Sequence, residues 1–285
     1  MSTFAEKLNR RVLAVDSLTC IGLDPDLGRL FPDGEPASTR AAADEVVRFN
    51  ATIIEATAPY ASAYKPNLAF YLPMGAEGIR ALLETRALIP NDIPVILDAK
   101  ASDMGNTAER YAEAYLDRWG FDAVTVTAYL GEEGLMPFLR RAGKGVIVVA
   151  KTSNSGSADF QDLRLESTGR PLSDQVAVRA VEWDAQYPAD VGLVVGATYP
   201  EHLERIRGLA PNLPILLPGV GAQGGDVAAS VRAGCDRDGR NLLVSAGRSI
   251  MYAGTGPEIG PAAQRAAEAL RDAVNQYRVS RLGGA

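Results

Sequence analysis

Eight short runs of apolar and often β-branched residues recur along the chain, and each is followed by a stretch with helical periodicity. Continuous apolar runs bounded by Gly or Pro are typical of strands that are buried on both faces of a parallel sheet. The sequence therefore predicts eight strands, which span residues 19–23, 61–65, 95–100, 123–129, 145–151, 191–197, 215–219 and 242–246.

The segments between these runs carry apolar residues at helical spacing. Val46, Phe49 and Ile53 mark one such face, and residues 261–277 form another amphipathic stretch. Eight strand–helix units without a Pro-, Gly- or Ser-rich linker favour a closed (β/α)8 TIM barrel that occupies residues 1–285 as a single domain. An open, doubly wound sheet is the alternative architecture.

The composition and the net charge exclude several classes of protein. Hydrophobic residues make up 47% and charged residues 22% of the chain, as in a soluble globular protein. The net charge of −6 argues against binding to nucleic acid or to an anionic membrane surface. Two cysteines, Cys20 and Cys235, cannot form a disulfide framework, and the single His202 excludes a multi-histidine metal site. A reduced, cytoplasmic location is expected.

The first residues predict a short helix and not a leader. Thr3 and Glu6 fit a capping box, and Phe4 and Leu8 are spaced i,i+4 on one face. This start lacks the apolar centre of a signal peptide. No apolar run approaches the roughly 20 residues that span a bilayer, so no membrane segment is expected.

Charged residues mark the ends of the first three predicted strands. Asp24 follows the first strand, Lys65 ends the second, Asp98 and Lys100 lie in the third, and Asp103 lies just beyond it. Active sites of (β/α)8 barrels lie at the C-terminal ends of the strands. Since residues i and i+2 of a strand face the same side, Asp98 and Lys100 are expected to point into the barrel mouth together.

Lys65, Asp98, Lys100 and Asp103 supply two ammonium and two carboxylate groups. Such a cluster suits holding an anionic substrate, delivering a proton and stabilising charge that develops at carbon. A structural alternative exists for each part. Asp98 and Lys100 could form an ion pair that closes the barrel top, and Asp103 could be the N-cap of a helix over residues 104–119.

Glycines follow the last two predicted strands. Residues 218–225 read Pro-Gly-Val-Gly-Ala-Gln-Gly-Gly, and Gly247 and Arg248 follow the eighth strand. Glycine lets backbone N–H groups approach an anion closely, and an Arg side chain adds a charged fork. Because phosphate sites in these barrels often lie after strands seven and eight, a phosphate site is expected there. A plain strand-to-helix turn is the alternative for the glycine-rich stretch.

Residues 153–169 form a long polar segment directly after the fifth predicted strand. A loop of this length in a compact domain is usually functional, and a mobile lid is expected. Thr125 and Thr127 share one face of the fourth strand, but the sequence assigns them no role. His202, at a predicted helix start, is expected to be a surface or capping residue.

The third predicted strand and its flank, residues 95–107, closely resemble the signature of the orotidine 5′-phosphate decarboxylase family, in particular its longer bacterial branch. Further matches follow in the family's order over most of the chain: Gly22-Leu23-Asp24-Pro25, Tyr64-Lys65-Pro66-Asn67, Thr152-Ser153-Asn154, Pro218-Gly219 with Gln223, and Gly247-Arg248-Ser249. Ala101 and Ser102 depart from the Arg-Gly that relatives commonly carry, but they lie between the charged positions.

The resemblance implies decarboxylation of orotidine 5′-phosphate to UMP and CO₂, the last step of de novo pyrimidine synthesis, without a cofactor or a metal. By position, Lys100 would protonate C6 as the carboxylate leaves, and Asp98 would lie against that carboxylate. Lys65 would join the charge network and reach the ribose, and Asp24 would bind ribose hydroxyls.

The resemblance also implies a homodimer with shared sites, in which Asp103 and Thr107 enter the site of the neighbouring subunit. The remaining substrate-binding residues would be Ser153 at the pyrimidine, Pro218, and, at the phosphate, Gln223, Gly247 and Arg248. The segment after Ser153 would close over the ligand.

Two other functions compete with this interpretation. Related barrels such as 3-keto-gulonate-6-phosphate decarboxylase and hexulose-phosphate synthase share the Asp-x-Lys-x-x-Asp pattern but use Mg²⁺, so sensitivity to EDTA would distinguish them. A non-catalytic phosphate-ligand sensor is the second rival. The complete Lys65, Asp98, Lys100 and Asp103 set argues against a sensor, because binding alone needs no such matched charges.

Overall fold

The computed structural model describes residues 2–34, 36–220 and 226–278, and its centre is an eight-stranded parallel sheet. Its strands are β1 Thr19–Leu23, β2 Ala63–Pro66, β3 Ile96–Ala101, β4 Ala123–Thr127, β5 Gly145–Lys151, β6 Asp190–Val195, β7 Ile215–Pro218 and β8 Leu242–Ala246. All eight predicted strands are present, and every boundary lies within two residues of the prediction.

The sheet closes into a barrel. Its strand order is β2-β1-β8-β7-β6-β5-β4-β3, and two isolated parallel bridges, Tyr64 to Val95 and Asn67 to Asp98, join β2 to β3. The predicted (β/α)8 barrel is therefore confirmed, and the open-sheet alternative is wrong. The strands are almost entirely buried because the helices cover the outside of the barrel while side chains fill its interior.

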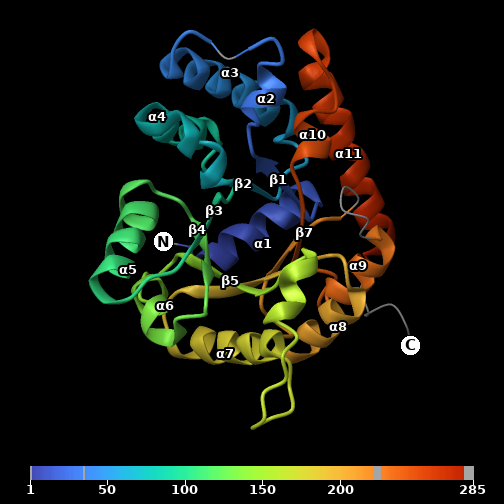
Figure 1. Cartoon of the computed structure of the whole chain (residues 1–285). Helices are drawn as coiled ribbons and strands as arrows, with labels where there is room; N and C mark the ends of the chain where they lie inside the picture. The colour runs from blue at the N-terminus through green and yellow to red at the C-terminus, as the bar shows by residue number, and fades with distance from the viewer. Residues whose placement is uncertain (1, 35, 221–225, 279–285) are drawn as a thin grey trace.

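Helices surround the strands (Figure 1). The α-helices are α1 Phe4–Val15, α2 Leu27–Leu30, α3 Thr39–Thr57, α4 Gly75–Leu88, α5 Gly105–Ala112, α6 Gly131–Leu139, α7 Leu172–Gln186, α8 Pro200–Leu209, α9 Val227–Gly234, α10 Arg248–Met251 and α11 Ile259–Tyr277. Short 3₁₀ turns span Leu68–Phe70, Leu72–Met74, Ser155–Asp159 and Gly256–Glu258. Within the described ranges, no helix combines the length and apolarity needed to cross a bilayer.

Helix α1 closes the N-terminal end of the barrel. The predicted capping box is present, with Thr3 and Glu6 exchanging side-chain and backbone hydrogen bonds. Phe4 packs so tightly against Gly145, the first residue of β5, that a Cβ at Gly145 would lie 2.6 Å from the Phe4 ring. The opposite, C-terminal end is left as the open mouth.

The third strand–helix connection differs from its prediction. Helix α5 begins at Gly105, and a π-helical turn over Glu113–Arg118 follows it instead of a continuous helix to residue 119. The carboxylate of Asp103 accepts a hydrogen bond from the N–H of Met104 at 2.8 Å, and Met104 occupies the N-cap position without a side-chain cap. The N-cap interpretation of Asp103 is therefore wrong.

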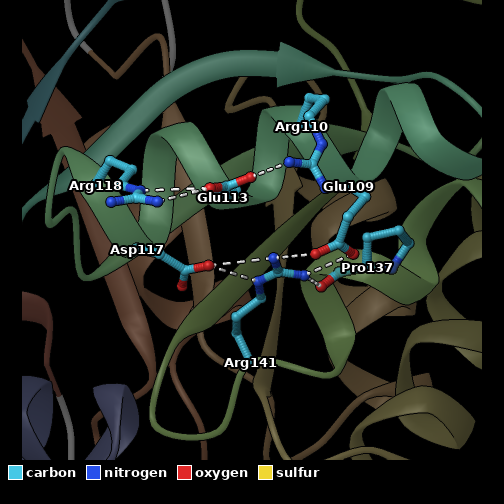
Figure 2. Close-up of polar contacts among 7 residues, drawn as sticks. All are labelled: Glu109, Arg110, Glu113, Asp117, Arg118, Pro137 and Arg141. Atoms are coloured by element: carbon cyan, nitrogen blue, oxygen red, sulfur yellow. Dashed lines mark hydrogen bonds and ion pairs between the residues drawn. The ribbon is translucent and has the colours of Figure 1, made fainter.

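An ion-pair network holds α5 and this π-helical turn against the end of α6 (Figure 2). The Arg141 guanidinium bonds to Glu109 at 2.6 Å, to Asp117 at 3.2 Å and to the carbonyl of Pro137. A second chain of contacts joins Arg110, Glu113 and Arg118 along the helix surface. The network fixes the orientation of α5, the helix whose first turn carries Thr107.

Candidate active site

Two adjoining cavities open at the C-terminal mouth of the barrel. One, of about 240 Å³, is lined by Asp24, Lys65, Asn67, Phe70, Asp98, Pro218, Gly219, Val220, Ser245, Ala246, Gly247, Arg248 and Ser249. The other, of about 260 Å³, is lined by Lys65, Asp98, Lys100, Thr125, Thr152, Ser153, Asn154, Val194, Leu216 and Pro218. Lys65, Asp98 and Pro218 belong to both, so the two hollows meet at the predicted charge cluster.

Asp98 is the centre of this cluster. Its Oδ1 accepts a hydrogen bond from the Nζ of Lys100 at 2.7 Å, and its Oδ2 accepts one from the Nζ of Lys65 at 2.9 Å. Asp98 and Lys65 are buried, whereas the Lys100 side chain is 47% exposed and borders the cavity. The sequence-based prediction that Asp98 and Lys100 converge at the mouth agrees with this geometry.

Burial and neighbouring charges shift the pKa values of these groups in different directions. Burial alone would raise the pKa of the Asp98 carboxyl, but the ammonium groups of Lys65 and Lys100 outweigh it and hold that pKa below its ordinary value. Burial alone would lower the pKa of Lys65, but the Asp24 and Asp98 carboxylates outweigh it and raise that pKa above the ordinary value. Asp98 and Lys65 are therefore both ionised at neutral pH.

Asp24 lies in the first cavity wall, just after β1. Its Oδ1 accepts the backbone N–H of Asn67 at 3.1 Å, which links the ends of β1 and β2. Burial raises the pKa of Asp24, with Asp98 adding to the rise and Lys65 opposing it. Asp24 and Asn67 thus place a carboxylate and a backbone amide side by side in the wall of the cavity that Asp98 and Arg248 also line.

Thr125 is a site residue for which sequence reasoning found no role. Its Oγ1 donates to Oδ1 of Asp98 at 2.9 Å and accepts the backbone N–H of Lys100 at 2.9 Å. The only sequence signal was its place on the inward face of the strand next to β3, which Thr127 shares. Lys100 itself has a left-handed backbone, with φ at +47°.

Part of the predicted phosphate site lies within the described residues. Pro218, Gly247 and Arg248 all line the first cavity, and Arg248 is an exposed residue at the start of α10. A Cβ at Gly22 would lie 3.0 Å from the Cα of Gly247, so a side chain there would have to push the end of β8 away from β1. Gln223 and most of the glycine-rich stretch lie outside the described residues.

Ser153 lines the second cavity, directly after β5. A Cβ at Gly196 would lie 2.7 Å from the Ser153 backbone nitrogen, so glycine at that position lets the end of β6 approach Ser153. The side chain of Gln161 accepts the N–H of Thr152 at 2.8 Å and donates to the Thr152 hydroxyl at 2.9 Å. The backbone beside Ser153 is thereby held from two sides.

The segment 153–169 is tied to the barrel at its middle. Asp162 accepts two hydrogen bonds, both 2.8 Å long, from the Nζ of Lys151, a residue that is only 1% exposed at the end of β5. His202 lies 4.0 Å from the same carboxylate. Beyond this tie, Figure 1 shows a yellow-green hairpin that projects from the ring of helices and is closed by a bridge between Arg164 and Pro171.

Among the predicted site residues that the structure describes, Asp103 and Thr107 line neither cavity. Asp103 is half-buried and Thr107 is exposed, beside the N-terminus of α5. Neither residue therefore forms part of the cavity walls of its own chain.

Neither cysteine lines either of the two cavities. Cys20 and Cys235 are both buried, and burial raises the pKa of each thiol to about 12, so neither is a nucleophile. Among the described residues, no group of three or more His, Cys, Asp or Glu side chains is arranged to hold a metal ion.

Comparison with known proteins adds an independent finding. Residues 17–260 match the family model described as "Orotidine 5'-phosphate decarboxylase / HUMPS family". A protein of Thermomicrobium roseum named orotidine 5'-phosphate decarboxylase is 48% identical and covers 99% of both chains. A protein of the same name from Halobacterium salinarum is 47% identical over 97% of this chain and 100% of its own.

The solved structures agree with this match. The structure of Leishmania donovani OMP decarboxylase is 39% identical in sequence, superimposes with a TM-score of 0.83, and covers 97% of this chain and 99% of its own. Such a likeness extends over nearly the whole chain.

Proposed function

The chain belongs to the orotidine 5′-phosphate decarboxylase / HUMPS family, and from this membership we propose that it converts orotidine 5′-phosphate to UMP and CO₂ with Lys100 as the proton donor. The observation that carries the proposal is the position of Asp98, a buried carboxylate held between Lys65 and Lys100 in the wall that both cavities share. The bond between C6 and the carboxylate carbon breaks, CO₂ leaves, and the electron pair left on C6 takes a proton from the Lys100 ammonium.

The sizes of the electrostatic energies indicate which interaction lowers the activation barrier most. Repulsion between the substrate carboxylate and Asp98 at about 4 Å amounts to roughly 4 kcal/mol at an effective dielectric constant near 20. Large enzymatic accelerations require up to roughly 20 kcal/mol. Repulsion alone is therefore insufficient. We assign the larger share to the fixed Lys100 ammonium, which faces the negative charge developing at C6.

Each of the two cavities suits a different part of the substrate. The anionic phosphate suits the first cavity, where Gly247 and the Arg248 guanidinium lie, and Asp24 suits hydrogen bonds to ribose hydroxyls. The pyrimidine suits the second cavity beside Ser153. This placement brings C6 to the shared wall, next to Asp98 and Lys100. Binding energy from the phosphate, far from the reacting carbon, then helps to orient the base.

We propose that the working unit is a homodimer in which Asp103 and Thr107 reach the partner's site. Their position outside both cavities of their own chain supports this arrangement. Mixing Asp103→Ala with Lys100→Ala chains tests it, because one site of each mixed dimer would keep an intact Lys100 and receive an intact Asp103. Activity should reappear on mixing. Two inactive variants that stay inactive as proven mixed dimers would contradict shared sites.

We also propose that residues 153–169 close over the bound nucleotide and exclude water. The tie between Lys151 and Asp162 supports a movement limited to the parts on either side of it. Protection of this segment from proteolysis on addition of UMP would be the expected sign. Unchanged cleavage with UMP at saturation would contradict closure.

One assay separates this function from its rivals. Loss of the orotate chromophore, followed by ultraviolet absorbance in buffer containing EDTA, should proceed at the same rate as without EDTA. Inhibition by EDTA that Mg²⁺ reverses would favour the Mg²⁺-dependent phosphosugar lyases, and binding of UMP without turnover would favour a sensor.

The cytoplasmic location remains a prediction, which cell fractionation would test.

A further inference from the structure

Strand β3 bulges at the point where Asp98 and Lys100 lie. Leu97 pairs with Val124 of β4, but the next pair is Ala101 with Val126. Three residues of β3 therefore face one residue of β4, which is Thr125. Bulges leave backbone groups without their ladder partners and redirect side chains, and they are frequent beside active sites.

The Thr125 side chain replaces the missing ladder bond. Its Oγ1 accepts the N–H of Lys100 at 2.9 Å, and because that bond uses an oxygen lone pair, the hydroxyl hydrogen remains for Asp98 Oδ1, also at 2.9 Å. Thr125 is only 1% exposed, and its β-branched side chain has few rotamers. The directions of both hydrogen bonds are therefore fixed.

The bond to Lys100 has a particular consequence for that residue. Its φ of +47° lies in the left-handed region, which residues other than glycine adopt only when their surroundings hold them there. The Thr125 hydroxyl is the neighbour that binds the Lys100 amide in this conformation. The direction in which the Lys100 side chain leaves the strand depends on it.

Building on the proposed function, we infer that Thr125 is a positioning residue for the decarboxylation. Its single hydroxyl bonds to the Lys100 amide and to the Asp98 carboxylate. It holds the Lys100 backbone in the left-handed bulge and orients the Asp98 carboxylate, so that the Lys100 Nζ lies 2.7 Å from Asp98 Oδ1 and faces the cavity. Misplacing a catalytic group by even about 1 Å is sufficient to slow a reaction by about a hundredfold.

Thr127 provides a matched control on the same strand. It lies two residues further along the same face of β4, but it lines a different cavity, together with Tyr129 and Phe160. Replacing either threonine by valine keeps the shape and removes one hydroxyl. Only the change at position 125 removes a bond to the charge cluster.

The test compares Thr125→Val, Thr125→Ser and Thr127→Val. We expect Thr125→Val to lower kcat about 10- to 100-fold, while KM and the affinity for UMP change less than about threefold, because the phosphate and ribose contacts remain. Thr125→Ser, which keeps the hydroxyl, should restore kcat to within about fivefold of the unmodified protein. Thr127→Val should leave kcat within about twofold.

Hydrogen exchange of the backbone amides gives a readout that needs no activity. A peptide covering residues 98–103 should exchange faster in Thr125→Val than in Thr125→Ser or Thr127→Val. Full kcat in Thr125→Val, equal losses in the valine and serine variants, or a parallel loss of UMP affinity would each overturn the positioning role. An unmodified protein that binds UMP but does not decarboxylate would refute the proposed function instead, and hydrogen exchange would still test the bulge.

Discussion

Two buried lysines lie at or near the ends of strands at different places around the barrel mouth, and their carboxylate partners lie in different parts of the fold. Lys65 of β2 is 6% exposed and pairs with Asp98, whereas Lys151 of β5 is 1% exposed and pairs with Asp162. Both pairs have N–O distances below 3 Å. Their partners differ: Asp98 belongs to a strand, and Asp162 belongs to the long segment that follows β5.

The surroundings of the two carboxylates explain the difference. Asp98 has a second ammonium, that of the half-exposed Lys100, and forms the wall of two cavities. Asp162 shares its side chain with one lysine and the nearby His202, and it holds a loop in place. A buried lysine–carboxylate pair is thus not by itself a sign of chemistry. A third, partly exposed charge facing a cavity is what distinguishes the cluster around Asp98.

The largest expected difference between the two regions is in turnover. Asp98→Asn should lower kcat by about a thousandfold, a loss typical of removing one group that acts in the transition state. Asp162→Asn should lower kcat by less than about tenfold, because Asp162 lies outside both cavities. Steady-state decarboxylation assays of both variants check this. Equal losses would show that the two pairs do not differ in function.

The Lys151–Asp162 pair should matter more for the free energy of unfolding than for turnover. Asp162→Asn leaves the Lys151 ammonium buried without its counter-charge, and the free energy of unfolding should fall by about 3 kcal/mol. Lys151→Met should cost only about 1 kcal/mol, because the Asp162 side chain that remains is 35% exposed and water can solvate it. Urea unfolding of the two variants measures the asymmetry. A larger loss in Lys151→Met than in Asp162→Asn would contradict this account of the loop anchor.

Arg248→Ala tests the phosphate end of the first cavity. Loss of a charged hydrogen bond should weaken the binding of UMP by roughly 1.5–3 kcal/mol, or about 10- to 150-fold. The affinity for uridine, which lacks the phosphate, should stay the same. Titration calorimetry with both ligands provides the comparison. A variant that loses affinity for both ligands equally would argue against a phosphate contact.

The pH dependence of stability should differ between Asp98 and Asp24. The pKa of Asp98 is lowered in the fold, so its stabilisation is present above the unfolded pKa of about 3.9 and is lost as the pH falls. The stability gap between the unmodified protein and Asp98→Asn should therefore shrink below about pH 4. The pKa of Asp24 is raised, so the gap to Asp24→Asn should change in the opposite direction. Urea unfolding between pH 6 and 3 measures both slopes; parallel slopes would disagree with this assignment.

The sequence predicts the barrel well because its strands are buried on both faces. Runs such as Gly145–Lys151 are continuous apolar stretches, and their limits coincide with the observed strand. The prediction was wrong for the helix after β3. A π-helical turn inside a helix leaves no mark in apolar spacing, and the Asp103 carboxylate bonds to the adjacent N–H instead of capping the first turn.

The cluster of Lys65, Asp98 and Lys100 could be predicted because charges that end apolar strands have few structural explanations. Thr125 could not, since its role depends on the bulge that sets it opposite Lys100, and a bulge of this kind is a property of strand register. The anchor at Lys151 was missed for a related reason. Its partner lies 11 residues further along the chain, in a loop whose path no periodicity describes.

The most direct test of the cluster around Asp98 is single-turnover decarboxylation by Lys100→Ala. The Lys100 side chain is 47% exposed, so the variant should fold and bind UMP as the unmodified protein does. We predict no measurable release of CO₂ from orotidine 5′-phosphate at saturating enzyme. Release at a rate within tenfold of the unmodified protein would contradict the assignment of Lys100 as the proton donor.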